Sequence, residues 1–151
     1  MNIESEIKST IELNIITKTV INILYTSKYI ENSFVSGLKP FDLSSQQYNV
    51  LRILRGQKGN PSNLSTLQER MIDKSSNTTR LVDKLIQKEF VNRQVCESNR
   101  RKVEIFITEK GLDLLKKLDP ITEQENKKLI QKLSQEDLKT FNRILDTIRT
   151  R

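Results

Sequence analysis

The chain has 151 residues, of which 30% are charged and 35% hydrophobic, and its net charge is +7 with a pI near 9.6. This length is typical of one domain, and the low apolar content favours long solvated or dimerising helices. A basic balance favours nucleic acid as the partner, with an anionic membrane surface as the alternative.

Missing residue types exclude several functions. The chain has no histidine and a single cysteine, Cys96, so neither an intrachain disulfide nor a Cys/His zinc site can form within it. It also lacks a P-loop, a G-x-S-x-G motif and a paired-cysteine motif, so we expect no enzyme, no metal and no cofactor. With Glu4 and Glu6 near its start and no apolar run of about 18 residues, the chain is expected in the cytoplasm, away from the membrane.

The first half of the chain predicts helices. Apolar spacing predicts one long helix over residues 3–35, ended by Gly37 and Pro40. Ser44 and Gln47 form a capping box for a second helix, whose core stripe is Tyr48, Leu51 and Leu54.

A loop over residues 56–61 precedes a pair of shorter helices. Ser62 or Asn63 caps the first, which runs through Met71 with Leu64 and Leu67 facing inward. The second is expected from Ser75 or Ser76 to Lys88, with apolar positions Leu81, Val82, Leu85 and Ile86.

After the second of these helices, apolar residues recur at every second position, which predicts strands over residues 91–96 and 103–107. The segment between them, ESNRRK, places Arg100, Arg101 and Lys102 in the tip of a β-hairpin.

Two helices end the chain. Thr108 caps the first, which buries Leu112, Leu115 and Leu118 and is expected to kink at Pro120; Ser134 and Asp137 cap the last, with Phe141, Ile144, Leu145 and Ile148 in a stripe. The predicted fold is mostly α with a small hairpin wing (α+β). Residues 41–107 form a winged helix-turn-helix, and residues 1–35 and 108–151 form a dimerisation region.

Residues 62–107 carry the functional prediction. In a helix-turn-helix, the N-terminal residues of the second helix enter the major groove. Short polar groups and one cation occupy that end here, which suits base edges and phosphates: Ser75, Ser76, Asn77, Thr78, Thr79 and Arg80. Lys84 and Lys88 continue a basic stripe from Arg80.

Positive charge is concentrated in the same region. Residues 74–102 hold eight basic and three acidic residues, a net of +5 out of the total of +7. A solvated face would explain a charge run, and loop solubility would explain Arg100 and Arg101. Beside a helix-turn-helix, however, a thin basic hairpin favours contact with the minor groove or the phosphates.

The segments SSNTTRLVDKLIQKEFVNR and NRRKVEIFITEKG resemble the MarR family of bacterial regulators (multiple antibiotic resistance regulators), closely over residues 75–111. FDLSSQQYNVLRIL also resembles the family's second helix. The resemblance implies a dimer joined by the terminal helices, a recognition helix matching TRLVDKL, and Arg101 as the minor-groove arginine of the wing. It also implies a repressor, often released by a small aromatic or phenolic ligand.

Three positions depart from the family pattern. Asn99 replaces the aspartate that usually braces the wing arginine. Gln68 stands where an alanine commonly packs, and the turn at Ile72 and Asp73 lacks the frequent glycine.

The apolar stripes of the terminal helices either pack in an ordinary core or pack against a second copy of the chain. The second alternative follows because a small chain offers these stripes no other partner. Tyr25, Tyr29, Phe34 and Tyr48 are candidates for a ligand pocket, although aromatics at helical spacing are more often core. For Cys96 we favour a structural role over redox sensing.

Two functions from different classes remain. The favoured one is a dimeric regulator that binds a pseudo-palindromic duplex operator, with recognition helices about 34–36 Å apart. The alternative is a winged-helix interaction module that binds protein or RNA without operator specificity.

Overall fold

The computed structural model describes residues 1–150. Its helices are α1 (Ile3–Glu6), α2 (Ile15–Leu38), a short 3-10 helix (Lys39–Phe41), α3 (Ser45–Gly56), α4 (Leu64–Arg70), α5 (Thr78–Gln87), α6 (Glu109–Ile130) and α7 (Gln135–Arg149). Its two strands, β1 (Val91–Cys96) and β2 (Asn99–Ile107), form one antiparallel hairpin. The predicted fold class is therefore confirmed.

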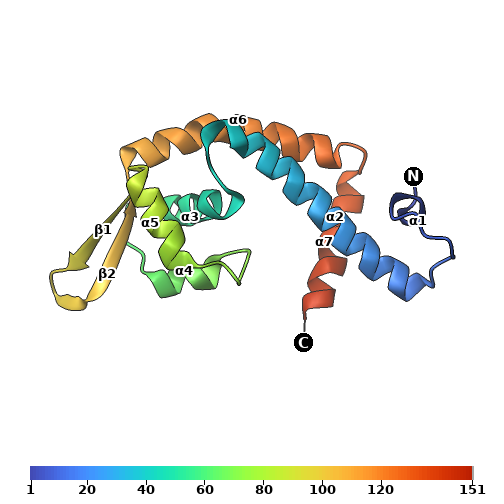
Figure 1. Ribbon diagram of the computed structural model, residues 1–151, viewed down its shortest axis with the longest axis horizontal. Helices are drawn as coiled ribbons and strands as arrows, with labels where there is room; N and C mark the ends of the chain where they lie inside the picture. Colours follow the sequence, from blue (N-terminus) through green and yellow to red (C-terminus); the bar gives the residue numbers. More distant parts are fainter. Residues whose placement is uncertain (151) are drawn as a thin grey trace.

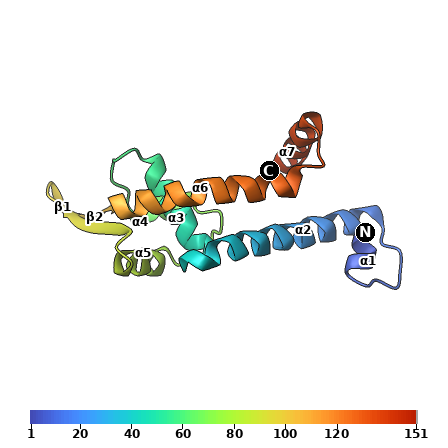
Figure 2. The ribbon, with the colours of Figure 1, turned by 90° about the horizontal axis from the view of Figure 1, so that it is seen from above.

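The elements form two groups. At one end, α3, α4, α5 and the hairpin make a lobe, and at the other end lie α1, α7 and most of α2 (Figure 1). The long helices α2 and α6 lie side by side and join the two ends, as Figure 2 shows from above. The hairpin, which we call the wing, projects from the lobe (Figure 1).

The hydrophobic core lies in the lobe. The predicted stripe on α3 is confirmed, and α6 contributes Leu114, Leu115 and Leu118, whereas Leu112 is only partly buried. Burying one large aliphatic side chain stabilises the fold by about 1.5–3 kcal/mol. The fully buried side chains outside α3 and α6 include Leu67, Met71, Val82, Leu85, Val91 and Ile105.

Helix starts follow the polar caps closely. The Ser44–Gln47 capping box is present in both directions, and Ser134 and Asp137 form a second one at α7. Asn63 and Thr108 accept from the third backbone N–H of α4 and α6. Each cap satisfies a donor that a helix terminus leaves free.

The prediction of a single helix over residues 3–35 was wrong. Helix α1 ends at Glu6, because Lys8 adopts a left-handed φ of 55°, and α2 starts only after Asn14, whose side chain accepts from Thr17 N at 3.0 Å. The end was also misplaced, since α2 continues through Gly37 to Leu38. Apolar spacing alone did not reveal the two asparagine caps, at Asn2 and Asn14.

Pro120 does not interrupt α6, which is one helix from Glu109 to Ile130. Pro120 is exposed, so its ring faces solvent rather than the core, and Lys116, whose carbonyl loses its partner in the helix, is exposed as well. Next to it, Asp119 accepts two hydrogen bonds from the Arg55 guanidinium, at 2.8 and 3.0 Å. This bidentate pair fixes α6 against α3, and so fixes the lobe against the helical end.

Candidate nucleic-acid interface

The recognition helix of the helix-turn-helix is α5. Its N-cap is Asn77, whose side-chain oxygen accepts from Arg80 N at 3.1 Å. The predicted start at Ser75 or Ser76 was therefore too early, and both serines lie in the turn before α5. Asn77 remains exposed, but its carbonyl oxygen is engaged as a cap.

The turn between α4 and α5 is held by side chains rather than by a glycine. Asp73 accepts hydrogen bonds from the Ser75 hydroxyl at 2.6 Å and from the Ser75 backbone N–H at 2.9 Å. These bonds, the hydroxyl's first, lower the pKa of the Asp73 carboxyl. Asn49, 23 residues earlier on α3, accepts from Ile72 N at 2.9 Å.

Gln68 links the two ends of this turn. Its amide nitrogen donates to the Lys74 carbonyl at 2.8 Å, and its amide oxygen accepts from the Thr78 hydroxyl. The glutamine at a position where alanine commonly packs therefore supplies two hydrogen bonds in place of a close packing contact. Thr78 is only 5% exposed, so its predicted role in contacting a base is not compatible with this position.

Other predicted side chains of α5 do face solvent. Thr79, Arg80 and Lys84 are exposed. Lys88 departs from the predicted basic stripe because its ammonium donates to the Asp42 carbonyl and to Gln47 Oε1, the latter at 3.3 Å. The outward-facing polar surface of the helix is therefore shorter than the sequence pattern indicated.

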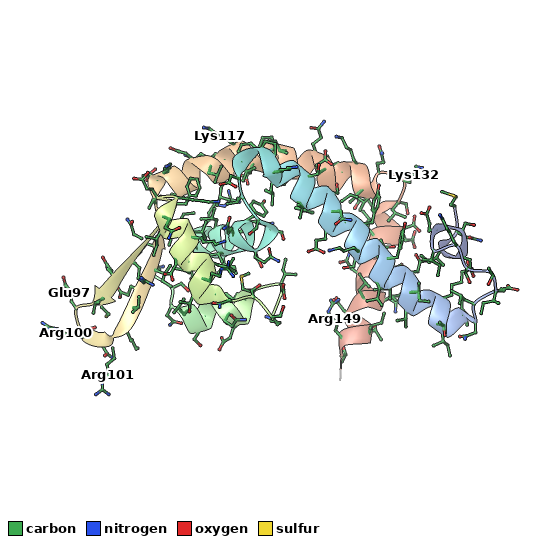
Figure 3. The ribbon with its side chains drawn as sticks, viewed as in Figure 1. Glu97, Arg100, Arg101, Lys117, Lys132 and Arg149 are labelled. Atoms are coloured by element: carbon green, nitrogen blue, oxygen red, sulfur yellow. The ribbon has the colours of Figure 1, made fainter. Side chains whose placement is uncertain are left out.

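The basic residues of the wing belong to a strand rather than to its loop. Asn99 pairs with Cys96 and Val103 pairs with Val95, so Arg100, Arg101 and Lys102 form an irregularity of β2 opposite a single step of β1. The tip itself is Glu97 and Ser98. All three cations are exposed, and Figure 3 shows Arg100 and Arg101 pointing away from the hairpin.

Asn99 braces the backbone of the wing. Its side-chain oxygen accepts from Arg101 N at 3.1 Å, whereas the aspartate usual at this position in the family braces the arginine side chain. The base of the wing is attached to the lobe by two backbone hydrogen bonds between Ser62 and Ile105, of 2.9 and 2.8 Å. In Figure 1 the N-terminal end of α5 and the tip of the wing lie on the same, lower side of the lobe.

The candidate ligand residues do not share one pocket. Tyr48 and Phe34 line a cavity of about 500 Å³ between α2, α3 and the turn after α4, together with Arg52, which lies 5.8 Å from the Tyr48 ring centre. Tyr25 and Tyr29 line a separate cavity of about 370 Å³ beside α1. There, the Tyr25 hydroxyl donates to Glu6 at 2.9 Å, which raises the Tyr25 pKa.

Residues 1–150 contain no group of three or more His, Cys, Asp or Glu side chains able to hold a metal ion. Among these residues no helix is long and apolar enough to cross a membrane. Cys96 is partly buried at the end of β1, with its sulfur 3.1 Å from the Ser98 hydroxyl.

The helix-turn-helix, the wing and the exposed cations on both define a winged helix-turn-helix protein. The sequence pattern of the MarR family matches residues 43–103. The HTH-type transcriptional regulator MhqR of Bacillus subtilis is 30% identical over 106 residues, which are 70% of this chain and 72% of that protein. The chain therefore belongs to the MarR family of transcriptional regulators.

Solved structures have the same architecture. A MarR transcription factor from Planctomyces limnophilus is 26% identical with a TM-score of 0.70, over 91% of this chain and 99% of that one. The organohalide-sensing regulator RdhR-CbdbA1625, in a 2,4-dichlorophenol-bound form, is 20% identical with a TM-score of 0.81, over 91% of this chain and 80% of that one.

The position of Thr78 leads to a prediction about stability. Thr78→Val keeps the shape but leaves Gln68 Oε1 without its donor, so we expect a loss of about 1–3 kcal/mol in the free energy of unfolding. Thr79→Val, the same change on the exposed side, should stay within about 0.5 kcal/mol. Urea unfolding of the two variants measures both values, and equal midpoints would contradict the structural role of Thr78.

Proposed function

We propose that this protein is a homodimeric repressor that binds a pseudo-palindromic duplex operator and has no enzymatic activity. The observation that carries the proposal is the exposure of cations on both the recognition helix and the wing, on one side of the lobe. Arg80 and Lys84 supply the first group, beside the exposed Thr79 hydroxyl, and Arg100, Arg101 and Lys102 supply the second. Membership of a family of transcriptional regulators supports the same conclusion.

The proposed contacts follow from the chemistry of DNA. The first turn of α5 enters the major groove, where Thr79 and Arg80 meet base edges and Lys84 meets a phosphate. Ser75, Ser76 and Asn77 lie at the free N–H groups of the helix, which favour a phosphate oxygen. Arg101 enters the minor groove, where its charge matches the negative potential, and Arg100 and Lys102 contact the backbone.

The proposed partner of the apolar helical end is a second copy of this chain. A groove of about 700 Å³ between α2 and α7 is lined by apolar side chains, among them Ile23, Phe141 and Ile144. Ile144 is 45% and Ile148 59% exposed although both lie on one stripe of α7. Burying such a stripe removes apolar area from water, and a twofold pair presents two recognition helices to one operator.

The proposed effector is a small phenolic or aromatic molecule in the cavity beside Tyr48. This cavity is bordered on one side by α2 and on the other by Ile72 and Asp73 of the helix-turn-helix. A ligand there would lower DNA affinity only if it favours a dimer geometry in which the two recognition helices have the wrong spacing. The exposed Arg52 supplies a cation for a phenolate.

Salt dependence and single variants test DNA binding. Affinity for the duplex upstream of the protein's own gene should fall linearly on a log–log plot against salt, with a slope of about −0.9 per neutralised phosphate. Arg101→Ala should weaken binding to every duplex and reduce the slope by about 1. Thr79→Val should instead change the preferred sequence, by on the order of 1–3 kcal/mol per base pair.

Lys117→Ala is the matched control for this titration, because it removes one positive charge from α6, on the opposite side of the molecule from the wing tip (Figure 3). Its affinity should equal that of the parent. Equal binding to the upstream and random duplexes, or preferential binding to RNA, would instead support the interaction-module alternative.

Ile144→Glu tests the proposed dimer. A carboxylate at this position of the α2–α7 groove would lose its hydration when a second copy covers the groove, so we expect dissociation into monomers of about 17.6 kDa in sedimentation equilibrium. Val95→Glu places the same charge on the wing at a position that is 56% exposed, and it should remain dimeric. A parent protein that sediments as a monomer would contradict the dimer.

Titration of 2,4-dichlorophenol into the protein–duplex complex tests the effector site. We expect release of the duplex, and Arg52→Ala should require a higher concentration because the phenolate loses its cation. Tyr29→Ala, in the separate cavity, should respond as the parent does. Undiminished DNA binding at saturating phenol would rule out this class of effector.

A further inference from the structure

The outer part of the wing has few attachments to the rest of the lobe, whereas Val91 and Ile105 at its base belong to the hydrophobic core. Asn92, Gln94 and Val95 of β1 are exposed, and a two-stranded ribbon by itself has little stability in water. Arg93 of β1 pairs with Ile105 of β2, and both residues of this pair also contact the rest of the lobe. The β2 edge is hydrogen-bonded to Ser62, and on the β1 edge Arg93 forms an ion pair with Asp83 of α5, with Nη1 and Oδ1 2.9 Å apart.

Asp83 places a negative charge among the cations of the recognition helix. It is the one acidic residue of α5, and it lies between the exposed cations Arg80 and Lys84 in the sequence. On a helix that approaches phosphates, a free carboxylate would repel the duplex. The Arg93 guanidinium neutralises this charge, so the pair compensates the carboxylate and at the same time connects the recognition helix to the wing.

The ion pair is too exposed to contribute much to the stability of the fold. The side chains of Arg93 and Asp83 are 44% and 47% exposed, and ion pairs that are this exposed contribute little to folding stability. The pair can still select one orientation of a weakly held hairpin, because it joins two elements that otherwise meet mainly at the base of the wing.

We propose that the Asp83–Arg93 ion pair is a positioning contact that holds the wing at the angle at which Arg101 and the first turn of α5 reach one duplex together. This inference rests on the proposed function. Neither residue needs to touch DNA, because the pair acts through Arg101.

A double-mutant cycle tests the positioning role. In the parent background, Arg101→Ala should lower duplex affinity about tenfold. In the Asp83→Asn background the same change should lower it less than about threefold, because a wing that is no longer held already contributes little. Arg93→Lys, made with Asp83 intact, keeps the charge pair. In that background Arg101→Ala should still lower duplex affinity by most of the tenfold factor.

Substitution of Arg93 and substitution of Asp83 should also differ in their effect on duplex affinity. Arg93→Ala leaves the Asp83 carboxylate unpaired beside the phosphates, so it should weaken binding more than Asp83→Asn does. Glu89→Gln is the control, since it removes an exposed ion pair with Lys110 of α6, at 3.1 Å, that does not connect the wing to α5. In the Glu89→Gln background, Arg101→Ala should still lower duplex affinity about tenfold. Thermal unfolding should be unchanged in all three variants.

Backbone ¹⁵N relaxation of the free protein tests the same contact without DNA. In the parent, the order parameters of Gln94 and Val95 should lie near the rigid value of about 0.85, and in Asp83→Asn they should fall toward 0.6 or below. Glu89→Gln should keep the parent values.

The outcomes distinguish the two proposals. A parent protein that binds no duplex overturns the proposed function, and the relaxation measurement then still decides whether the ion pair holds the wing. If the parent binds, a full tenfold Arg101→Ala effect in the Asp83→Asn background overturns the positioning role. Unchanged order parameters in Asp83→Asn overturn it as well.

Discussion

The hydrogen bonds of Gln68 are the constraint on which the candidate interface depends. Through them, α4 holds the Lys74 carbonyl in the turn and the Thr78 hydroxyl in the first turn of α5. Together with the Asn77 cap, these two hydrogen bonds fix where α5 begins and therefore which of its residues face solvent. Thr79 and Arg80 point outward because Thr78 points inward.

The lobe and the helical end differ in how far they bury their apolar side chains. The lobe has a well-buried core and a surface rich in cations, whereas the helical end leaves large apolar side chains exposed on α2 and α7. The Arg55–Asp119 pair and the packing of α2 along α6 join them. The position of the recognition helix relative to α2 and α7 therefore depends on these contacts.

The wing differs from the rest of the lobe in how it is held. Its base is fixed by backbone hydrogen bonds to Ser62, while its outer part depends on contacts between side chains that solvent reaches. Such contacts contribute little to the stability of the fold, but they can favour one orientation of the outer part of the wing. The substitution of asparagine at position 99 fits this, since Asn99 supports the backbone of Arg101 rather than its guanidinium.

By itself, the sequence determined the order of the elements from α3 onward, most helix caps and most of the core stripes, because side-chain oxygens at N-caps and the period of apolar residues act locally. It missed the break between α1 and α2. It also located the cations of α5 and the wing. Only the tertiary structure decided that Thr78 is buried, that Lys88 turns to Asp42, that the three tyrosines divide between two cavities, and that Asp83 meets Arg93. Each of these depends on a partner from another element or on the side of a helix that packs against it, and no local spacing encodes such a contact.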